Sequence, residues 1–174
     1  MDRIIIADYD PAWPARFEEE REAIVAALGG AAAGVVAIEH VGSTSVPGLA
    51  AKPIIDIAIG VRQVADAVPC ITPIVGLGYK CMGEFGIPGR LYFRKGKPRS
   101  HHLHMVVHQG EFWQDHIGFR DALRGQPDLA QEYARLKREL AAHHVGDRVG
   151  YTEAKTPFIQ SALARADMQT APPG

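Results

Sequence analysis

Short apolar runs, several of them with polar residues at alternate positions, occupy much of the first two thirds of the chain and are typical of β-strands. VVAIEHV and HHLHMVVH mix apolar and polar positions, whereas IIDIAIGV is apolar except for one acid. Two further runs are joined by a segment rich in glycine, which is typical of a turn. The predicted strands cover residues 3–7, 35–41, 54–61, 78–83, 90–96 and 101–108.

A helical spacing of apolar residues characterises the other segments. Pro14 is expected to open a helix that runs to about Leu28 and ends at a pair of glycines. Residues 63–77 also have a helical pattern, although two prolines interrupt it. From Phe112 the chain is predicted to be helical almost to its end. The predicted helices there are 111–125, 127–144 and 150–167.

This order of elements predicts an α+β fold. We expect a mixed sheet with flanking helices, followed by a helical C-terminal third. The chain has 174 residues, which is the size of one ordinary domain. We therefore expect a single domain over 1–174, with a sheet-containing core at 1–110 and a helical part at 111–168.

Charge and hydropathy limit the possible partners. The formal net charge is −1, so the chain as a whole has no strong attraction to nucleic acid or to a membrane surface. No apolar run approaches the roughly 18 residues of a membrane span, and the first residues do not resemble a secretory signal. We expect a cytoplasmic protein that binds neither nucleic acid nor membrane, and the sequence does not predict its oligomeric state.

The stretch between the second and third predicted strands carries the first candidate site. Gly42 allows close approach to the backbone, and Ser43 and Thr44 offer hydroxyl groups, a combination that suits a phosphate. Asp56 is costly within an apolar strand unless it is paired, hydrogen-bonded or bound to a metal. These residues suggest a phosphate site beside an acid that binds Mg²⁺. The alternative is that the hydroxyls only cap a turn and that Asp56 pairs with Lys52 or an arginine.

The string GSTSVPGLAAKPIID resembles the GrpB-like family, a branch of the nucleotidyltransferase superfamily. That superfamily has a Gly-Gly or Gly-Ser pair followed by Asp-x-Asp or Asp-x-Glu on a strand. Here the pair is Gly42-Ser43 and the acid is Asp56. The blocks HHLHMVV, FWQDHIGFRDALR, EYARLKRELA and YTEAKTPFI extend the resemblance over most of the chain.

The resemblance implies a nucleotidyltransferase-like sheet, a nucleotide or another phosphate-containing small molecule as ligand, and a divalent cation, Mg²⁺ or Mn²⁺. Similar domains also occur fused to dephospho-coenzyme A kinases, which indicates coenzyme A as a second class of ligand.

One position departs from the superfamily pattern. Its second acid falls at Ala58, which cannot bind a metal, whereas two-metal transfer needs several carboxylates. His102 and His104 share one face of their predicted strand, and either is a candidate for the missing ligand. Imidazole suits Mn²⁺ better than Mg²⁺. Alternatively one of these histidines acts as a general base for a hydroxyl nucleophile, or binds a phosphate or a carboxylate, or is only hydrogen-bonded to its neighbours.

Four basic residues are candidates for binding phosphate. Lys52 precedes the strand of Asp56, and Arg94 lies on a strand face where it could point into a groove. Arg120 and Lys155 belong to the blocks that match the family. Cationic side chains on the wall of a groove suit phosphate, although charges on a helix more often face solvent.

Two functional hypotheses follow. In the first, the protein is an enzyme that transfers a nucleoside monophosphate from a nucleoside triphosphate to a hydroxyl on a small molecule or a protein. Asp56 then binds the metal, and His104 is a second ligand or the base. In the second, the protein is a non-catalytic module that binds a nucleotide or coenzyme A and has a degenerate metal site. Ala58 favours the second hypothesis, or an enzyme with different metal ligands.

Overall fold

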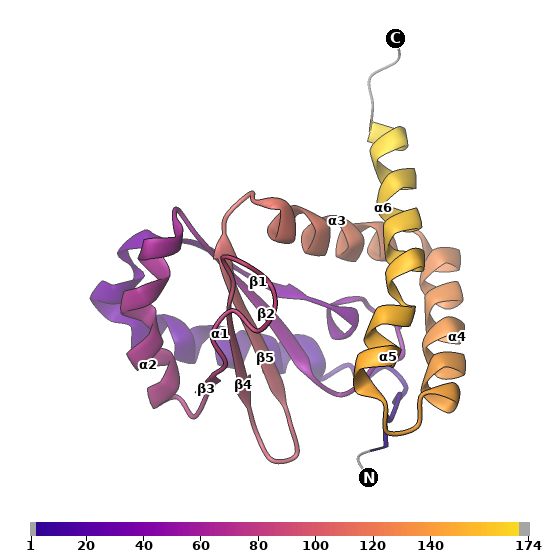
Figure 1. The fold of residues 1–174 in the computed structure, drawn as a ribbon, viewed down its shortest axis with the longest axis horizontal. Helices are drawn as coiled ribbons and strands as arrows, with labels where there is room; N and C mark the ends of the chain where they lie inside the picture. Colours follow the sequence, from indigo (N-terminus) through magenta and orange to yellow (C-terminus); the bar gives the residue numbers. More distant parts are fainter. Residues whose placement is uncertain (1–2, 171–174) are drawn as a thin grey trace.

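The computed structural model describes residues 3–170 (Figure 1). In this part of the chain the strands form one five-stranded sheet with the order β1-β2-β5-β4-β3. β2 and β5 are parallel, and the other neighbours are antiparallel, so the predicted mixed sheet is confirmed. The strands are β1 (Val35–Val41), β2 (Ile55–Val61), β3 (Lys80–Cys81), β4 (Leu91–Lys95) and β5 (His101–Val107).

Helices precede, interrupt and follow the sheet. The α-helices are α1 (Trp13–Leu28), α2 (Ile71–Gly76), α3 (Glu111–Gly125), α4 (Pro127–His143), α5 (Arg148–Ala154) and α6 (Thr156–Thr170). Three 3-10 helices complete the elements: η1 (Gly29–Gly34), η2 (Ser43–Ser45) and η3 (Val64–Cys70). Among the described residues, no helix combines the length and the apolar character that crossing a membrane requires.

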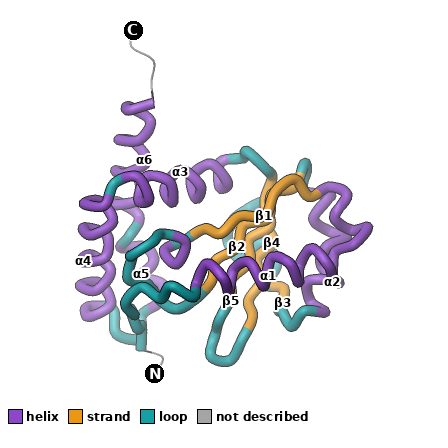
Figure 2. The backbone as a smooth tube through the Cα atoms, turned by 180° about the vertical axis from the view of Figure 1, so that it is seen from behind, coloured by secondary structure: helices purple, strands orange, loops and turns teal. Residues whose placement is uncertain are grey.

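The two faces of the sheet pack against different helices. Ile57 of β2 belongs to a large apolar core that includes Ile24 of α1 and Ile74 of α2. Ala58, the next residue, belongs to a smaller cluster with Trp113 of α3. Successive side chains of a strand point to opposite faces, so α1 and α2 cover one face and α3 lies on the other. α1 crosses behind the sheet in Figure 1 and in front of it in Figure 2.

The C-terminal helices pack together at one end of the sheet, as Figures 1 and 2 show from opposite sides. They form an apolar cluster of their own, which includes Leu123 of α3, Leu129 of α4 and Ala162 of α6. Val46 and Leu49, from the segment between β1 and β2, complete this cluster. The helical part is therefore packed directly onto the loop that carries the candidate phosphate site.

Two predicted elements differ in the structure. Residues 3–7 were predicted to form a strand, but only Ala7 pairs, through a single bridge to Ala51. Three consecutive isoleucines do not specify a strand without a neighbour to pair with. The helix predicted at 150–167 is divided into α5 and α6. Pro157 explains the division, because proline has no amide hydrogen and disfavours the helical conformation in the residue before it.

The segment predicted to be helical at 63–77 is a 3-10 helix followed by a short α-helix. Pro69 lies inside the 3-10 segment, which is consistent with the interruption that the prolines were expected to cause. The other predicted helices, and the strands β1, β2, β4 and β5, begin and end within about two residues of their predicted limits.

Candidate functional site

Gly42 follows β1 and turns the chain toward β2. Its φ of 71° is in the region that favours glycine. A Cβ atom at this position would lie 2.6 Å from Oδ2 of Asp56. The turn continues into η2, where the amide of Ser45 donates to the carbonyl oxygen of Gly42 at 3.1 Å. Glycine is therefore needed both for the backbone conformation and for the close approach of the Asp56 carboxylate.

Asp56 lies at the centre of a polar group on the face of the sheet opposite to Ile57. Oδ1 of Asp56 is 3.2 Å from Nδ1 of His102 and 3.6 Å from Nε2 of His104. Burial opposes ionisation of the carboxyl, but the hydrogen bonds of the two histidines outweigh it, and the charge that each histidine carries when protonated acts in the same direction, so the pKa of Asp56 lies well below its usual range. Asp56 is therefore a carboxylate at neutral pH and accepts hydrogen bonds only.

His104 has a polar neighbour at each ring nitrogen. Nη1 of Arg90 is 3.4 Å from Nδ1 of His104. A guanidinium is always a donor, so Nδ1 accepts and the proton of the neutral ring is on Nε2, toward Asp56. Burial lowers the pKa of His104, and the nearby charge of Arg90 lowers it further, although Asp56 opposes both. In this arrangement His104 has no lone pair left for a metal ion or for a substrate proton.

Ala58 lies beneath α3 and not on the open part of the sheet face. It is fully buried, and Val41, Val106 and Trp113 surround it. A carboxylate in its place would lie between its cross-strand neighbours Glu39 and His104 and would meet the apolar side chains that α3 packs onto this part of the sheet. This apolar packing disfavours a second metal-binding acid at the position.

Two lysines from distant parts of the sequence meet at one tyrosine. Nζ of Lys52 lies 4.3 Å from the ring centre of Tyr151, and Nζ of Lys155 lies 4.6 Å from the same centre. Within residues 3–170, no carboxylate forms an ion pair with either lysine. Burial lowers the pKa of Lys52 to about 8, and the charges of Lys155, Arg148 and then Arg99 act in the same direction.

The negative charge of Asp56 acts on both lysines. Its charge opposes the lowering of the pKa of Lys52, and it likewise opposes the effect of burial on Lys155. These opposing effects place the lysines within electrostatic range of the Asp56 carboxylate. The loop after β1, the start of β2 and the helix pair α5 and α6 therefore meet around one carboxylate and several cations.

The structure separates two predicted phosphate-binding residues from this group. Thr44 is buried, and its hydroxyl donates to the carbonyl of Ile54 at 3.1 Å and accepts from Nε2 of His40 at 2.9 Å. Arg120 pairs with Glu39 at 2.8 Å and with Asp121 at 2.9 Å. Both side chains are thus already engaged in the fold. Their proposed role in phosphate binding stays a prediction.

Arg94 lies directly across from His102 in the pairing of β4 with β5. Its guanidinium is 4.5 Å from the ring centre of Phe85 and 5.2 Å from that of Tyr92. Nε of Arg94 is buried and has no hydrogen-bond partner among the described residues. Arg94 therefore lies on the same face as the histidines, on the side away from Asp56.

Two further residues lie beside the site. Lys137 of α4 is buried, donates to the carbonyl oxygen of Ala50, and lies 4.7 Å from the ring centre of Tyr133. Burial lowers its pKa to about 7. Tyr133 is also buried, and a hydrogen bond with the Ser43 side chain partly offsets the rise that burial causes in its pKa. Both residues lie in the block EYARLKRELA, whose resemblance to the family was the sequence signal for Lys137, whereas Tyr133 was missed.

A cavity of about 520 Å³ lies beside the Arg90 end of the polar group. Its lining includes Arg90, Phe112 and His116, together with apolar residues of β5 and of the loop before β4. A second cavity, of about 490 Å³, lies between the N-terminal segment and α4, where Arg138 pairs with Asp8 at 2.8 Å. Asp56 lines neither cavity.

The donors around Asp56 do not match a two-metal centre. Across residues 3–170, no group of three or more histidine, cysteine, aspartate or glutamate side chains is arranged to hold a metal ion. Asp56 supplies the single carboxylate, both nitrogens of His104 are engaged, and Ala58 has no donor. The assignment of Asp56, His102 and His104 as metal ligands stays a prediction.

Comparison with known proteins places the chain in a family. A model of the family described as "GrpB protein" matches residues 3–165. The crystal structure of the conserved protein GrpB from Enterococcus faecalis superposes with a TM-score of 0.84 at 38% sequence identity, covering 95% of this chain and 98% of that one. Both sequence and fold therefore support the same relationship.

Several curated proteins are similar over almost the whole chain. The UPF0157 protein YqkA of Bacillus subtilis is 40% identical over 165 residues, which are 94% of this chain and 47% of YqkA. The glutamate-rich protein GrpB of Alkalihalophilus pseudofirmus is 32% identical, over 92% of this chain and 94% of that protein. A dephospho-CoA kinase of Mycolicibacterium paratuberculosis is 28% identical, over 90% of this chain but 44% of the kinase. The chain thus spans about half the length of two of these relatives, and it belongs to the GrpB family.

Proposed function

We propose that this protein binds a phosphate-containing small molecule of the nucleotide or coenzyme A class beside Asp56. The observation that carries the proposal is the pair Lys52 and Lys155, which approach one tyrosine ring without a carboxylate partner among the described residues. Holding two partly buried ammonium groups close together is unfavourable, as the lowered pKa of Lys52 indicates. An anionic ligand between them would relieve this cost.

The chemistry of the neighbouring groups supports a phosphate. Phosphate oxygens accept several hydrogen bonds and carry charge that lysine and arginine neutralise. Gly42 and Ser43, at the turn beside Asp56, are both only partly buried. The similarity to a protein named dephospho-CoA kinase is consistent with a ligand of this class.

Transfer of a nucleoside monophosphate from a triphosphate to a hydroxyl is the second candidate function. The observation that favours it is the contact between the Asp56 carboxylate and His102, since a carboxylate that orients a histidine is a common arrangement for proton transfer. Ala58 and the engaged nitrogens of His104 argue against the two-metal form of this reaction.

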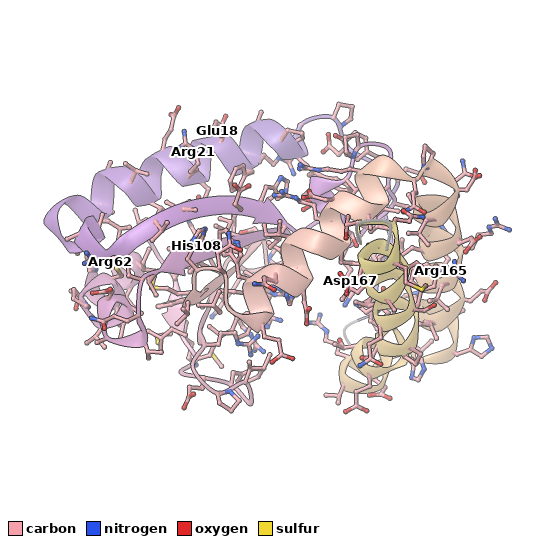
Figure 3. All side chains as sticks on the ribbon, turned by 90° about the horizontal axis from the view of Figure 1, so that it is seen from above. Glu18, Arg21, Arg62, His108, Arg165 and Asp167 are labelled. Carbon is pink, nitrogen blue, oxygen red and sulfur yellow. The ribbon has the colours of Figure 1, made fainter. Side chains whose placement is uncertain are left out.

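Titration calorimetry with ATP, coenzyme A and pyrophosphate tests the binding proposal. We expect at least one of these probes to bind, and Lys52→Met to weaken it by about tenfold or more, because a charged hydrogen bond contributes about 1.5–3 kcal/mol. Arg62→Gln is the matched control. Arg62 is exposed and lies at the opposite end of the molecule from α6 (Figure 3). Failure of the wild type to bind any of the three probes would refute the proposal.

A further inference from the structure

A row of three polar side chains crosses three neighbouring strands on one face of the sheet. Asp56 of β2 pairs in register with His102 of β5, and His102 pairs in register with Arg94 of β4. Cross-strand partners on one face lie side by side. The ring of Tyr92 contacts two members of the row, with its centre 5.5 Å from the His102 ring and 5.2 Å from the Arg94 guanidinium.

The hydrogen bond to Asp56 fixes the tautomer of His102. Asp56 accepts only, so Nδ1 of His102, which is 3.2 Å from Oδ1, carries the proton. In the neutral ring the lone pair is then on Nε2. That atom is buried and has no hydrogen-bond partner within residues 3–170. Nε of Arg94, which is a donor, is also buried and has no hydrogen-bond partner within residues 3–170.

Comparison with His104 shows that the unused lone pair on a ring nitrogen is specific to His102. The two histidines occupy alternate positions of the same strand, and each faces the same oxygen of Asp56. Arg90 donates to Nδ1 of His104, so His104 turns its Nε2–H toward Asp56. His102 therefore has the opposite tautomer and is the member of the pair that keeps an unused lone pair.

A buried acceptor and a buried donor on two cross-strand partners match a hydroxyl group, which donates one hydrogen bond and accepts others. We propose that Asp56, His102 and Arg94 form the site for the hydroxyl of a second substrate, and that Nε2 of His102 is the base that takes its proton. The inference rests on the proposed phosphate site for the group that the hydroxyl attacks. It deepens the second candidate function, because it assigns the proton acceptor to a residue other than His104.

In the proposed step the hydroxyl attacks the bound phosphate ligand. The hydroxyl oxygen forms a bond to a phosphorus atom of the bound ligand while the bond from that phosphorus to its leaving phosphate or pyrophosphate oxygen breaks. The hydroxyl proton moves to Nε2 of His102, and the Asp56 carboxylate stabilises the resulting imidazolium. His102 is thus a catalytic residue, whereas Asp56 is a positioning residue that sets the tautomer.

Access to the row involves the loop between β3 and β4. The atoms Nε2 of His102 and Nε of Arg94 are enclosed in the free protein, and Phe85 lies over the Arg94 guanidinium. The Phe85 side chain is exposed, and its backbone φ is 48°, which is unusual for a residue other than glycine. The proposal therefore includes displacement of Phe85 when the hydroxyl enters.

Nuclear magnetic resonance of the full chain labelled with ¹⁵N-histidine tests the tautomers without any ligand. The variants His102→Gln and His104→Gln assign the two sets of signals. We expect His102 to carry its proton on Nδ1 and His104 to carry it on Nε2. In Asp56→Ala we expect His102 to move toward the Nε2–H form, which is the form that free histidine prefers. A wild-type His102 with its proton on Nε2 would overturn the inference.

A second experiment tests the role of His102 as proton acceptor. It measures the hydrolysis of ATP, with ATP as the phosphate probe and water in place of the hydroxyl. We expect His102→Gln to slow the release of phosphate or pyrophosphate by about 100-fold or more while leaving ATP affinity within about twofold. His108→Gln is the control, because His108 follows the same strand but packs against Trp113 at a ring distance of 4.9 Å (Figure 3).

The outcomes separate the two proposals. If the wild type binds ATP but does not turn it over, or if His102→Gln turns it over at the wild-type rate, the proton-acceptor role is wrong and the phosphate site stands. If none of the phosphate probes binds to the wild type, the proposed function fails, and the tautomer measurement alone then decides whether the row is arranged as inferred.

Discussion

Lys52 and Lys95 are both partly buried beside the same sheet, yet their surroundings differ. Lys95 of β4 donates to both carboxylate oxygens of Glu20 in α1, at 2.8 and 3.1 Å. Lys52 contacts the ring of Tyr151 and forms no ion pair with a carboxylate among the described residues. The comparison indicates that the first lysine stabilises the packing of α1, whereas the second is available to an anion from solution.

The largest expected effect is on stability. Lys95→Met leaves Glu20, which is 9% exposed, without its cation, and should cost about 2–3 kcal/mol of unfolding free energy. Lys52→Met removes a charge that burial disfavours, so we expect an unchanged or higher stability at neutral pH. Urea denaturation at pH 7 measures both. Equal destabilisation by the two substitutions would contradict the conclusion that Lys95 stabilises the fold and Lys52 does not.

The next effect concerns the turn beside Lys52. Gly42→Ala should cost about 2–3 kcal/mol, since positive φ costs an alanine about 1–2 kcal/mol and the new Cβ meets Asp56. Gly48→Ala is the matched control, because Gly48 has a φ of 79° but no atom within 4 Å of the place that a new methyl group would take. We expect about 1 kcal/mol there. The difference in denaturation free energy isolates the contact with Asp56, and no difference would contradict it.

The pH dependence of binding should follow Lys52. A lysine with a lowered pKa is charged below that value and neutral above it, so a ligand that needs the charge binds best at low pH. With a pKa of about 8 for Lys52, ATP affinity should fall about tenfold between pH 7 and pH 9. Lys52→Met should flatten this dependence in calorimetry, and Lys95→Met should retain it. If Lys52→Met leaves the pH profile unchanged, the charge on which ATP binding depends belongs to another group.

Divalent ions should have the smallest effect. Because the donors around Asp56 do not match a two-metal centre, we expect Mg²⁺ or Mn²⁺ to change ATP affinity by no more than about threefold, less than about 1 kcal/mol. Calorimetry in the presence of each ion checks this. Binding that depends strongly on Mn²⁺ and is lost in Asp56→Asn would instead support the metal site expected from the family resemblance.

Much of the fold could be predicted because its signals are local. The strands 35–41, 54–61 and 101–108 were predicted within a residue, since β-branched runs and alternation are read directly from the sequence. The strand at 3–7 was wrong because pairing depends on a partner that the sequence does not name. The break before α6 was missed although Pro157 was visible, because the helical pattern on both sides concealed it.

The site was only partly predictable. The approach of Gly42 to Asp56 follows from the family pattern and is confirmed by the geometry of the turn. The difference between His102 and His104 was not predictable, because it depends on a donor from another part of the chain, Arg90. Lys52 and Lys155 were both expected to bind phosphate, but their meeting at the ring of Tyr151 was not predictable, since it depends on tertiary packing.

The segment between β1 and β2 is held at several points by the helices. Arg124 donates to the carbonyl of Ser45 at 3.0 Å, Lys137 donates to that of Ala50, and Val46 and Leu49 are buried. A ligand that reaches Gly42 therefore meets a backbone whose shape is already set. Little ordering entropy is lost on binding such a loop, and its association rate is limited by encounter and not by rearrangement. Slow hydrogen exchange in the free protein at the amides of Ser45, Val46 and Leu49, which donate to carbonyl groups within this segment, would be the kinetic mark of this preorganisation.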